Sequence, residues 1–301
     1  MENIKNYIAE VTAKYDFPTP STEDFLNASD IISTCQEAKR LFDQQIRLYE
    51  EDLMCSFKGA FINVRKAAEL CDARKETVNA LYLLCLTEHL HRLYAIRELD
   101  ETWYDGIIDD LRIKNDECRL IKGVSGTFVP EWYYKFFDLT RFAMGRLQFE
   151  PMFMQESNSY NGDHVEKDEF SIGIHIPGGS RLDIGECMKA LRMAYNKFRP
   201  YFADGVVLFN CSSWLLAPDN KKLLDTESNI VKFGELFNVI PSEQHVDHDF
   251  WRIYGREDCS DIASLPRDNS VRKAYALCAE RFEIPNAGLG IIRMKDGEII
   301  K

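Results

Sequence analysis

The stretch from Phe170 to Leu216 constrains the fold of this chain more than any other. It reads FSIGIHIP, GGSRLD, IGECMKALRMAYNKF and GVVLFNCSSWLL, the order strand, glycine turn, amphipathic helix, strand. A strand that leads through such a turn onto a helix gathers several unpaired backbone N–H groups in one place. These groups can hold a phosphate or pyrophosphate, although the same arrangement also serves as an ordinary connection. We therefore interpret the segment as part of an α/β ligand-binding domain.

Length and charge narrow the possible partners. The 301 residues are enough for one large or two ordinary domains, and 45% hydrophobic with 29% charged residues is a globular composition. The formal net charge of −12 argues against nucleic-acid binding, which usually needs a basic face, and against an anionic membrane surface. We expect a small-molecule substrate, no nucleic-acid partner and no membrane partner. The sequence does not indicate an oligomeric state.

Cysteine usage and the N-terminal residues indicate the compartment. The start, MENIKNYIAE, has an acidic residue at position 2 and no apolar core, so it does not resemble a secretory signal. Nine cysteines occur and no two are closer than 14 residues, which excludes CxxC metal pairs. An odd number of cysteines without an export signal is typical of reduced, mostly buried thiols. We expect a cytoplasmic protein.

The first part of the chain is predicted to be helical. From Ile31 to Leu53 apolar residues recur at the three-and-four spacing of a buried helix face. Pro18 and Pro20 break the chain before it, and Ser21 followed by Asp24 has the pattern of a helix cap. Further helices are predicted over Thr77–Leu99, Trp103–Ile113 and Glu131–Phe142, the last opened by Pro130.

Past Met144 the apolar period changes to two, which is typical of strands. In RLQFEPMFM, Leu147, Phe149 and Phe153 alternate with Gln148 and Glu150. In FSIGIHIP one face carries Phe170 and three isoleucines, and the other carries Ser171, Gly173 and His175. Two of these last positions have little side chain, so another backbone or a ligand can lie close against them. Asn161-Gly162 is a hairpin signal between the two strands.

The rest of the chain continues this mixture. The helix after the glycine turn is predicted to bury Ile184, Cys187, Met188, Leu191, Tyr195 and Phe198, to end near Arg199-Pro200, and to be followed by a strand opened by Gly205. Further strands are predicted over Asn229–Phe237, Phe250–Gly255 and Leu289–Met294, with a helix over Asn269–Phe282. The fold class is α+β: a helical N-terminal domain, residues 1–138, and a mixed-sheet α/β domain, residues 139–301, in which the Phe170 and Val206 strands are neighbours.

Three segments carry more specific motifs. They are Gly145-Arg146-Leu147-Gln148-Phe149-Glu150, His175-Ile176-Pro177 before the glycine loop, and SSWLLAPDNKKLLDTESNIVKF from Ser212 to Phe233. Together they resemble a family of bacterial two-domain proteins with an N-acyltransferase N-terminal domain and a GNAT-like C-terminal domain. The resemblance covers residues 105–295, and before that it rests on helicity alone.

The resemblance implies a GNAT-like fold in the C-terminal domain and acyl-CoA-dependent acyl transfer. Coenzyme A or acyl-CoA would be the cosubstrate, bound at Gly178, Gly179, Ser180 and Arg181. Typical GNAT loops read Gln/Arg-x-x-Gly-x-Gly/Ala, whereas this chain keeps two glycines and a basic residue at a different spacing. Asp183 with Glu186 forms a capping box, and its negative charge would compete with a phosphate at that helix end.

Acyl transfer to an amine needs a path for the amine proton, donors to the carbonyl oxygen and an acid for the thiolate. His175 is the candidate base, and Glu150, on the adjacent predicted strand, is a candidate carboxylate near the acceptor, as the resemblance to GNAT enzymes implies. We predict that both point into a common cleft rather than to opposite sides of the sheet. Tyr254 in FWRIYG is the candidate proton donor. The alternatives are a structural histidine, a salt-bridged or solvated glutamate and a tyrosine buried in a sheet.

Other reactive residues carry a weaker pattern. Cys211 alternates onto one face of an apolar strand, and no activated-serine motif surrounds Ser212 and Ser213, so packing is the better interpretation. His89 and His91 are two apart on a helix and therefore point about 200° from each other, which excludes a shared metal. His245 and His248 lie near two aspartates, but nothing else supports zinc there, and we predict no metal.

We therefore expect an acyl-CoA-dependent N-acyltransferase that acts on an unidentified small acceptor. The alternative is a non-catalytic ligand-binding or interaction module on a degenerate GNAT-like fold.

Overall fold

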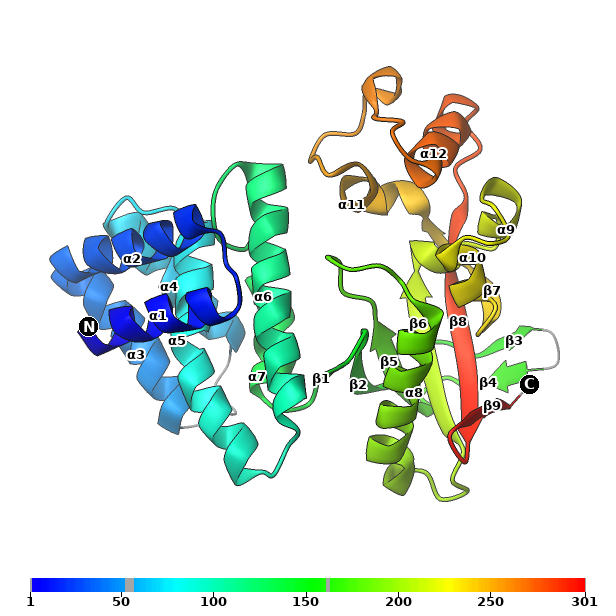
Figure 1. Cartoon of the computed structure of the whole chain (residues 1–301), viewed down its shortest axis with the longest axis horizontal. Helices are drawn as coiled ribbons and strands as arrows, with labels where there is room; N and C mark the ends of the chain where they lie inside the picture. Colours follow the sequence, from blue (N-terminus) through cyan, green and yellow to red (C-terminus); the bar gives the residue numbers. More distant parts are fainter. Residues whose placement is uncertain (1, 52–56, 161–162, 301) are drawn as a thin grey trace. The chain divides into compact units, whose positions relative to one another are not determined.

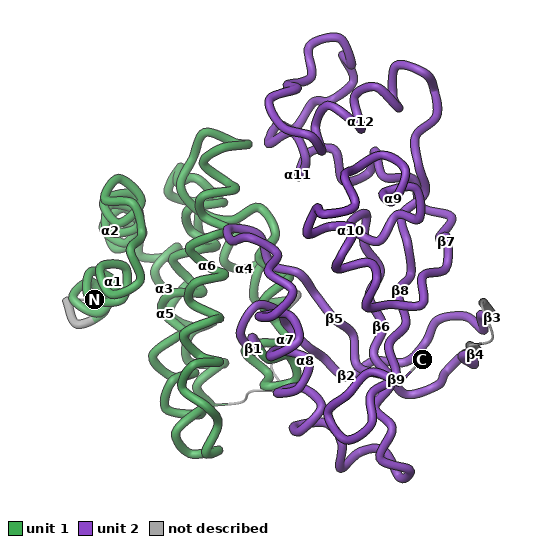
Figure 2. The backbone as a smooth tube through the Cα atoms, turned by 45° about the vertical axis from the view of Figure 1, so that its right-hand side comes forward, with its two compact units in different colours: residues 1–142 green, residues 143–301 purple. Residues whose placement is uncertain are grey.

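The computed structural model describes residues 2–51, 57–160 and 163–300 (Figure 1). The chain divides into two compact units, Met1–Phe142 and Ala143–Lys301, coloured separately in Figure 2.

Unit 1 is helical. Its elements are α1 (Glu2–Lys14), α2 (Thr19–Thr34), α3 (Gln36–Glu51), α4 (Phe57–Leu70), α5 (Lys75–Ile96), α6 (Glu101–Lys122), the 3₁₀ turn η1 (Pro130–Tyr133) and α7 (Tyr134–Phe137). Helix α5 contacts α1, α2, α3, α4 and α6, and it buries five consecutive residues from Ala80 to Leu84. A helix that is apolar on all sides lies inside its unit, so α5 is the central helix. Rings of Tyr49, Phe61 and Tyr82 contribute to the core around it.

Two predictions for the N-terminal helices are wrong in detail. The single helix predicted from Ile31 is two helices, because Cys35 adopts an extended conformation between α2 and α3. Its predicted end at Leu53 lies outside the described residues. Ser21 does not cap a helix: α2 begins at Thr19, and the buried Ser21 hydroxyl instead accepts a hydrogen bond from Asn115 Nδ2 at 3.0 Å. Proline is well tolerated in the first helical turn, so Pro20 starts the helix rather than preceding it.

The later helices agree better with their predictions. Helix α5 contains most of the predicted Thr77–Leu99 segment. Helix α6 contains the predicted Trp103–Ile113 segment but runs nine residues further, to Lys122, and Gly123 ends it with φ +69°. The helix predicted over Glu131–Phe142 is shorter: η1 and α7 end at Phe137, and strand β1 (Phe142–Met144) begins where the helix was expected to finish.

Unit 2 contains the sheet. Its strands are β2 (Leu147–Phe153), β3 (Asn158–Tyr160), β4 (Asp163–Val165), β5 (Phe170–His175), β6 (Val207–Ser213), β7 (Asn238–His245), β8 (Asn286–Lys295) and β9 (Glu298–Ile300). Its helices and 3₁₀ turns are α8 (Ile184–Phe198), η2 (Arg199–Tyr201), η3 (Trp214–Leu216), α9 (Asn220–Leu223), α10 (Asn229–Gly234), η4 (Val246–Asp249), α11 (Phe250–Tyr254), η5 (Ile262–Ser264) and α12 (Ser270–Glu280). Asn161-Gly162, the predicted hairpin turn, lies outside the described residues; β3 and β4 flank it and pair antiparallel.

The main sheet is mixed. Its strand order is β1-β2-β5-β6-β8-β7, with β9 paired to β8. Strands β5 and β6 are parallel, while β2 with β5, β6 with β8, and β7 with β8 are antiparallel. This confirms that the Phe170 strand and the Val206 strand are neighbours. The predicted Leu289–Met294 strand is part of β8.

Helix α8 connects the two parallel strands and packs on β2. Its buried side includes the predicted Cys187, Leu191, Tyr195 and Phe198, together with two alanines, whereas Ile184 and Met188 are only half-buried. The Tyr195 hydroxyl donates to Gly205 O at 3.2 Å and accepts from Asp296 N at 2.8 Å, which ties the helix to the loops at both sides.

Two predicted strands are helices. Asn229–Phe237 contains α10, whose first turn is capped by Ser228 Oγ accepting from Val231 N at 3.2 Å. Phe250–Gly255 contains α11, in which Phe250, Ile253 and Tyr254 are buried. Positions i, i+3 and i+4 form one face of a helix, and in so short a segment they are easily mistaken for a strand pattern. The helix predicted over Asn269–Phe282 is confirmed as α12.

Candidate functional site

The pairing between the two parallel strands is short. Strands β5 and β6 share two register pairs, Ile172 with Phe209 and Gly173 with Asn210. Both strands continue toward their carboxyl ends, where β5 stays paired to β2 and β6 stays paired to β8. The β5–β6 ladder thus ends before the strands do, and at this same end β5 leads into the glycine turn. In open α/β sheets, ligands bind beyond the carboxyl ends of such strands.

The glycine turn places backbone N–H groups in front of α8. Gly179 has φ +79°, a left-handed conformation that glycine adopts without strain. Asp183 caps α8, as predicted, because its Oδ1 accepts from Glu186 N at 3.0 Å. Among the described residues, no protein acceptor faces the N–H groups of residues 178–182. The donors for an anion are therefore those of the turn, since the carboxylate of Asp183 already occupies the helix end.

The side chain of Arg146 makes three hydrogen bonds to backbone carbonyls of the turn. Arg146 donates from Nη1 to Pro177 O at 2.9 Å, from Nη2 to Ser180 O at 3.1 Å and from Nε to Arg181 O at 3.0 Å. Burial lowers the pKa of this guanidinium. The Arg181 side chain itself is exposed.

The side chains of His175, on β5, and Glu150, on β2, lie close together. Gln148 is opposite His175 and Glu150 is opposite Gly173, so Glu150 and His175 share one face as diagonal neighbours. His175 Nε2 lies 3.0 Å from Glu150 Oε1. The Glu150 side chain is 5% exposed and that of His175 is 26% exposed. Both side chains therefore lie on one side of the sheet, as predicted, and Pro151 does not disturb the register. That they line a common cleft stays a prediction.

The same face carries further polar groups. Asn210 is in register with Gly173, and its Nδ2 donates to Ser171 Oγ at 2.9 Å. Both residues are buried. The space beside Gly173, expected to admit a backbone or a ligand, is instead filled by the Met152 sulfur. Buried polar groups are usually hydrogen-bonded, and Ser171 and Asn210 satisfy each other in this way.

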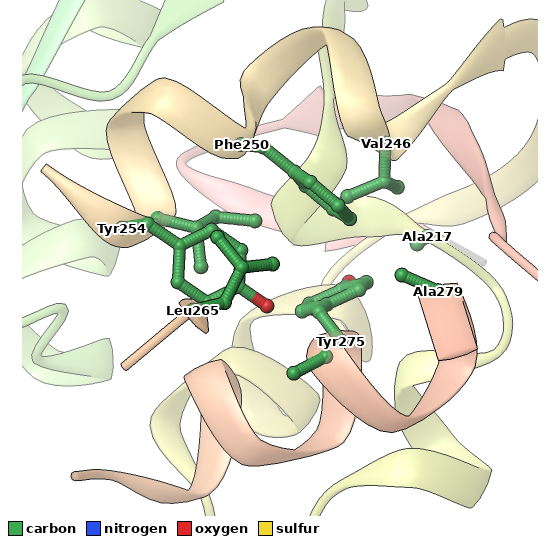
Figure 3. Packing of buried hydrophobic residues seen from close by; sticks show 9 residues of the cluster. Ala217, Val246, Phe250, Tyr254, Leu265, Tyr275 and Ala279 are labelled. Atoms are coloured by element: carbon green, nitrogen blue, oxygen red, sulfur yellow. The ribbon is translucent and has the colours of Figure 1, made fainter. Parts of the chain in front are cut away.

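Tyr254 belongs to a different part of unit 2. It lies on α11 in an apolar cluster with Phe250, Leu265 and Tyr275 (Figure 3). Its hydroxyl donates to Arg272 O at 3.0 Å, and burial raises its pKa to about 12. A buried tyrosine with a backbone acceptor has a sufficient structural role.

The other residues considered for nucleophilic or metal chemistry have roles in packing or in capping. Cys211 is buried, and desolvation raises its pKa to about 12, so the thiol stays protonated at neutral pH. Ser213 Oγ accepts from Leu215 N at 3.2 Å and thereby caps η3. All eight cysteines at described positions are free. Within the described ranges, no three His, Cys, Asp or Glu side chains gather as a metal site would require.

A cavity of about 220 Å³ lies between η3, α9, α10 and the start of β7. Its walls include Leu215, Val231, Phe237 and Val239. Val239 pairs with Gly290, which pairs with Cys211, so the cavity is on the opposite side of the sheet from Asn210 and His175. None of the predicted site residues belongs to its walls.

Family comparisons agree with this architecture. The N-acyltransferase N-terminal domain matches residues 6–139, and the GNAT-like C-terminal domain matches residues 141–283. The chain belongs to this two-domain N-acyltransferase/GNAT-like family. No curated protein matches it in sequence.

Solved structures share the fold of this N-acyltransferase/GNAT-like protein. An acyltransferase in complex with decanoyl-CoA has a TM-score of 0.70 and 19% identity, over 94% of this chain and 86% of the other. An acyltransferase in complex with decanoyl-CoA and teicoplanin has a TM-score of 0.69 and 16% identity, over 95% and 87%. At these identities the likeness establishes the common fold.

Sequence reasoning missed two features of this GNAT-like domain. One is the contact between Arg146 and the glycine turn, because the GRLQFE motif predicted no role for this arginine. The other is the Ser171–Asn210 hydrogen bond, for which an asparagine within the apolar run VLFNC was an available signal. In the part of the chain that the structure describes, no helix is both long and apolar enough to cross a bilayer.

Proposed function

We propose that this protein is an acyl-CoA-dependent N-acyltransferase that acts on an amine of a small-molecule acceptor. The observation that carries the proposal is the turn of residues 178–182, whose N–H groups face no protein acceptor. The turn follows the carboxyl end of β5, beyond the last residue that pairs with the parallel strand β6. Membership of the two-domain family supports it. So does the shared fold with acyltransferases crystallised with acyl-CoA. We keep residues 1–138 and 139–301 as the limits of the two functional domains.

The turn would bind the pyrophosphate of coenzyme A. Backbone N–H groups of Gly178, Gly179, Ser180 and Arg181 are suitable donors because oriented amides attract anions without a counter-charge. The exposed guanidinium of Arg181 adds a positive charge beside them. Asp183 opposes this attraction with a negative charge at the helix end, so the turn rather than the helix dipole supplies the favourable interaction.

The His175–Glu150 pair would handle the amine proton. Glu150 Oε1, which lies 3.0 Å from His175 Nε2, would stabilise the imidazolium that forms when the ring takes up a proton. The acceptor nitrogen attacks the thioester carbonyl, the C–S bond breaks, and the amine proton passes to the imidazole. The products are an amide and coenzyme A; the thiolate takes a proton from water, and the imidazolium returns its proton to water, so that the base is regenerated. Tyr254 is not assigned as the acid, because its hydroxyl already donates to Arg272 O.

Thermal shift with free coenzyme A and acyl-CoAs from acetyl to decanoyl tests the proposal. A ligand that binds only the folded protein raises its melting temperature by mass action. Release of free thiol from acyl-CoA in the presence of a panel of primary amines then measures transfer. Binding without any amine-dependent thiol release would favour the alternative, a non-catalytic binding module.

A charge reversal locates the site. Arg181→Glu should raise the Kd for coenzyme A by about tenfold or more, because it places a negative charge beside the pyrophosphate. Arg281→Glu is the matched control: the same change at another exposed arginine of unit 2, at the end of α12. If wild type binds and both variants bind equally well, coenzyme A does not occupy this turn.

A further inference from the structure

The three hydrogen bonds from Arg146 determine which way the glycine turn presents its amides. In a trans peptide the carbonyl of one residue and the N–H of the next point in opposite directions. Arg146 binds the carbonyls of Pro177, Ser180 and Arg181. It therefore turns the N–H groups of the following residues, Gly178, Arg181 and Leu182, away from itself. These are three of the N–H groups that face no protein acceptor in the described structure.

We infer that Arg146 is a positioning residue that shapes the turn of residues 177–182 into a receptor for a pyrophosphate group. The inference rests on the proposed function and adds to it a residue that would not itself touch the ligand. A guanidinium suits this task because its donors diverge in one rigid plane, and here three of them reach three different carbonyls. Its positive charge, held directly behind the turn, adds a favourable field for an anion in front.

Local backbone geometry brings Arg146 to this position. Gly145 has φ +62° and turns the chain between β1 and β2. A side chain at Gly145 would also come within 3.1 Å of Met193 Cε on α8. The start of β2 therefore lies close under α8, and Arg146, just before the strand, reaches the turn that precedes the helix. The Gly-Arg pair of the GRLQFE motif thus has a physical role.

The test compares Arg146→Lys and Arg146→Met with wild type on two ligands, coenzyme A and an acyl-pantetheine that lacks the pyrophosphate. A lysine carries one donor nitrogen and cannot replace three diverging bonds. We expect the Kd for coenzyme A to rise about tenfold for Arg146→Lys and more for Arg146→Met. The KM for acyl-pantetheine should change less than about twofold, and kcat at saturating acyl-CoA should fall little.

Arg192→Lys is the matched control. Arg192 is on α8 and also holds a loop, through Nε to Gly297 O at 3.2 Å and Nη2 to Glu298 Oε1 at 2.8 Å. This variant should leave both ligands unaffected. An equal loss of affinity for coenzyme A and acyl-pantetheine in Arg146→Lys would mean that Arg146 only supports the fold, and no loss at all would overturn the inference equally.

Inorganic pyrophosphate separates this inference from the proposed function. If wild type is stabilised by pyrophosphate, Arg146→Lys is not, and acyl-CoA has no effect on either, the positioning role stands and the acyltransferase proposal fails. If acyl-CoA stabilises both proteins equally, the positioning role fails and acyl transfer stands. If neither ligand stabilises wild type, both fail.

Discussion

The short distance between Glu150 and His175 permits a quantitative prediction. Replacing Glu150 by glutamine keeps the shape and an acceptor oxygen for His175 Nε2 but removes the charge that stabilises an imidazolium. For unit charges 3.0 Å apart, Coulomb's law at an effective dielectric constant of about 20 gives roughly 5.5 kcal/mol. Partial exposure of the His175 ring, 26%, reduces this to about 3–4 kcal/mol. We therefore expect kcat to fall about a hundredfold to a thousandfold.

The melting temperature serves as the internal control. Glu150→Gln should change it little, since no buried charge is left unpaired. His175→Ala should lower both turnover and melting temperature, because it leaves a 5% exposed carboxylate without its histidine. Adding Glu150→Gln to His175→Ala removes that carboxylate, so the double variant should regain stability but not activity.

The assay is thiol release at saturating acyl-CoA, normalised to folded protein measured by calorimetry. The pair His164 and Glu166, with Nε2 and Oε1 2.8 Å apart and side chains 52% and 68% exposed, is the matched control. His164→Ala with Glu166→Gln should leave kcat unchanged. Retention of kcat within about twofold by Glu150→Gln would refute the reasoning, and so would a double variant that recovers turnover together with stability.

Two further predictions concern α8 and α11. Asp183→Ala removes the cap of α8, in which Oδ1 accepts from Glu186 N at 3.0 Å, and should destabilise the protein by about 1 kcal/mol. The Kd for coenzyme A, measured by titration calorimetry, should fall or stay the same, because a negative charge near the turn is removed. A weaker affinity would show that the carboxylate assists binding. Tyr254→Phe removes the hydrogen bond to Arg272 O and should lower the free energy of unfolding in denaturant by about 1 kcal/mol, with kcat unchanged. A tenfold loss of kcat per folded molecule would instead identify Tyr254 as the proton donor.

Local signals predicted the central segment of unit 2 well. About twenty consecutive residues contain the glycine turn, the Asp183 cap and the apolar stripe of α8. Each of these features depends on neighbours three or four positions away in the sequence. Alternation along two strands was also enough to put His175 and Glu150 on one side, because a regular strand has a period of two. The family motifs added the fold class.

Local signals gave the wrong secondary structure for two short segments. Residues 229–234 and 250–254 are helices of six and five residues, and in so few positions a helical face and a strand face contain similar apolar spacings. For residues 250–254 tertiary packing supplied the missing information, because Phe250 and Tyr254 belong to one apolar cluster with Tyr275 of α12 (Figure 3). The break at Cys35 likewise divides a continuous apolar stripe that predicted one helix.

The chain's own sequence thus determined its helical first part, its mixed sheet and the strand–turn–helix unit, since these follow from propensity and periodicity along the chain. Only the tertiary structure decided that Arg146 lies behind the turn 35 residues later and that Asn210 reaches Ser171 across 39 residues. It also showed that Tyr254 is held by Arg272 O. Contacts of this kind depend on strand order and register, and no pattern of neighbouring residues encodes which distant backbone carbonyl a side chain will meet.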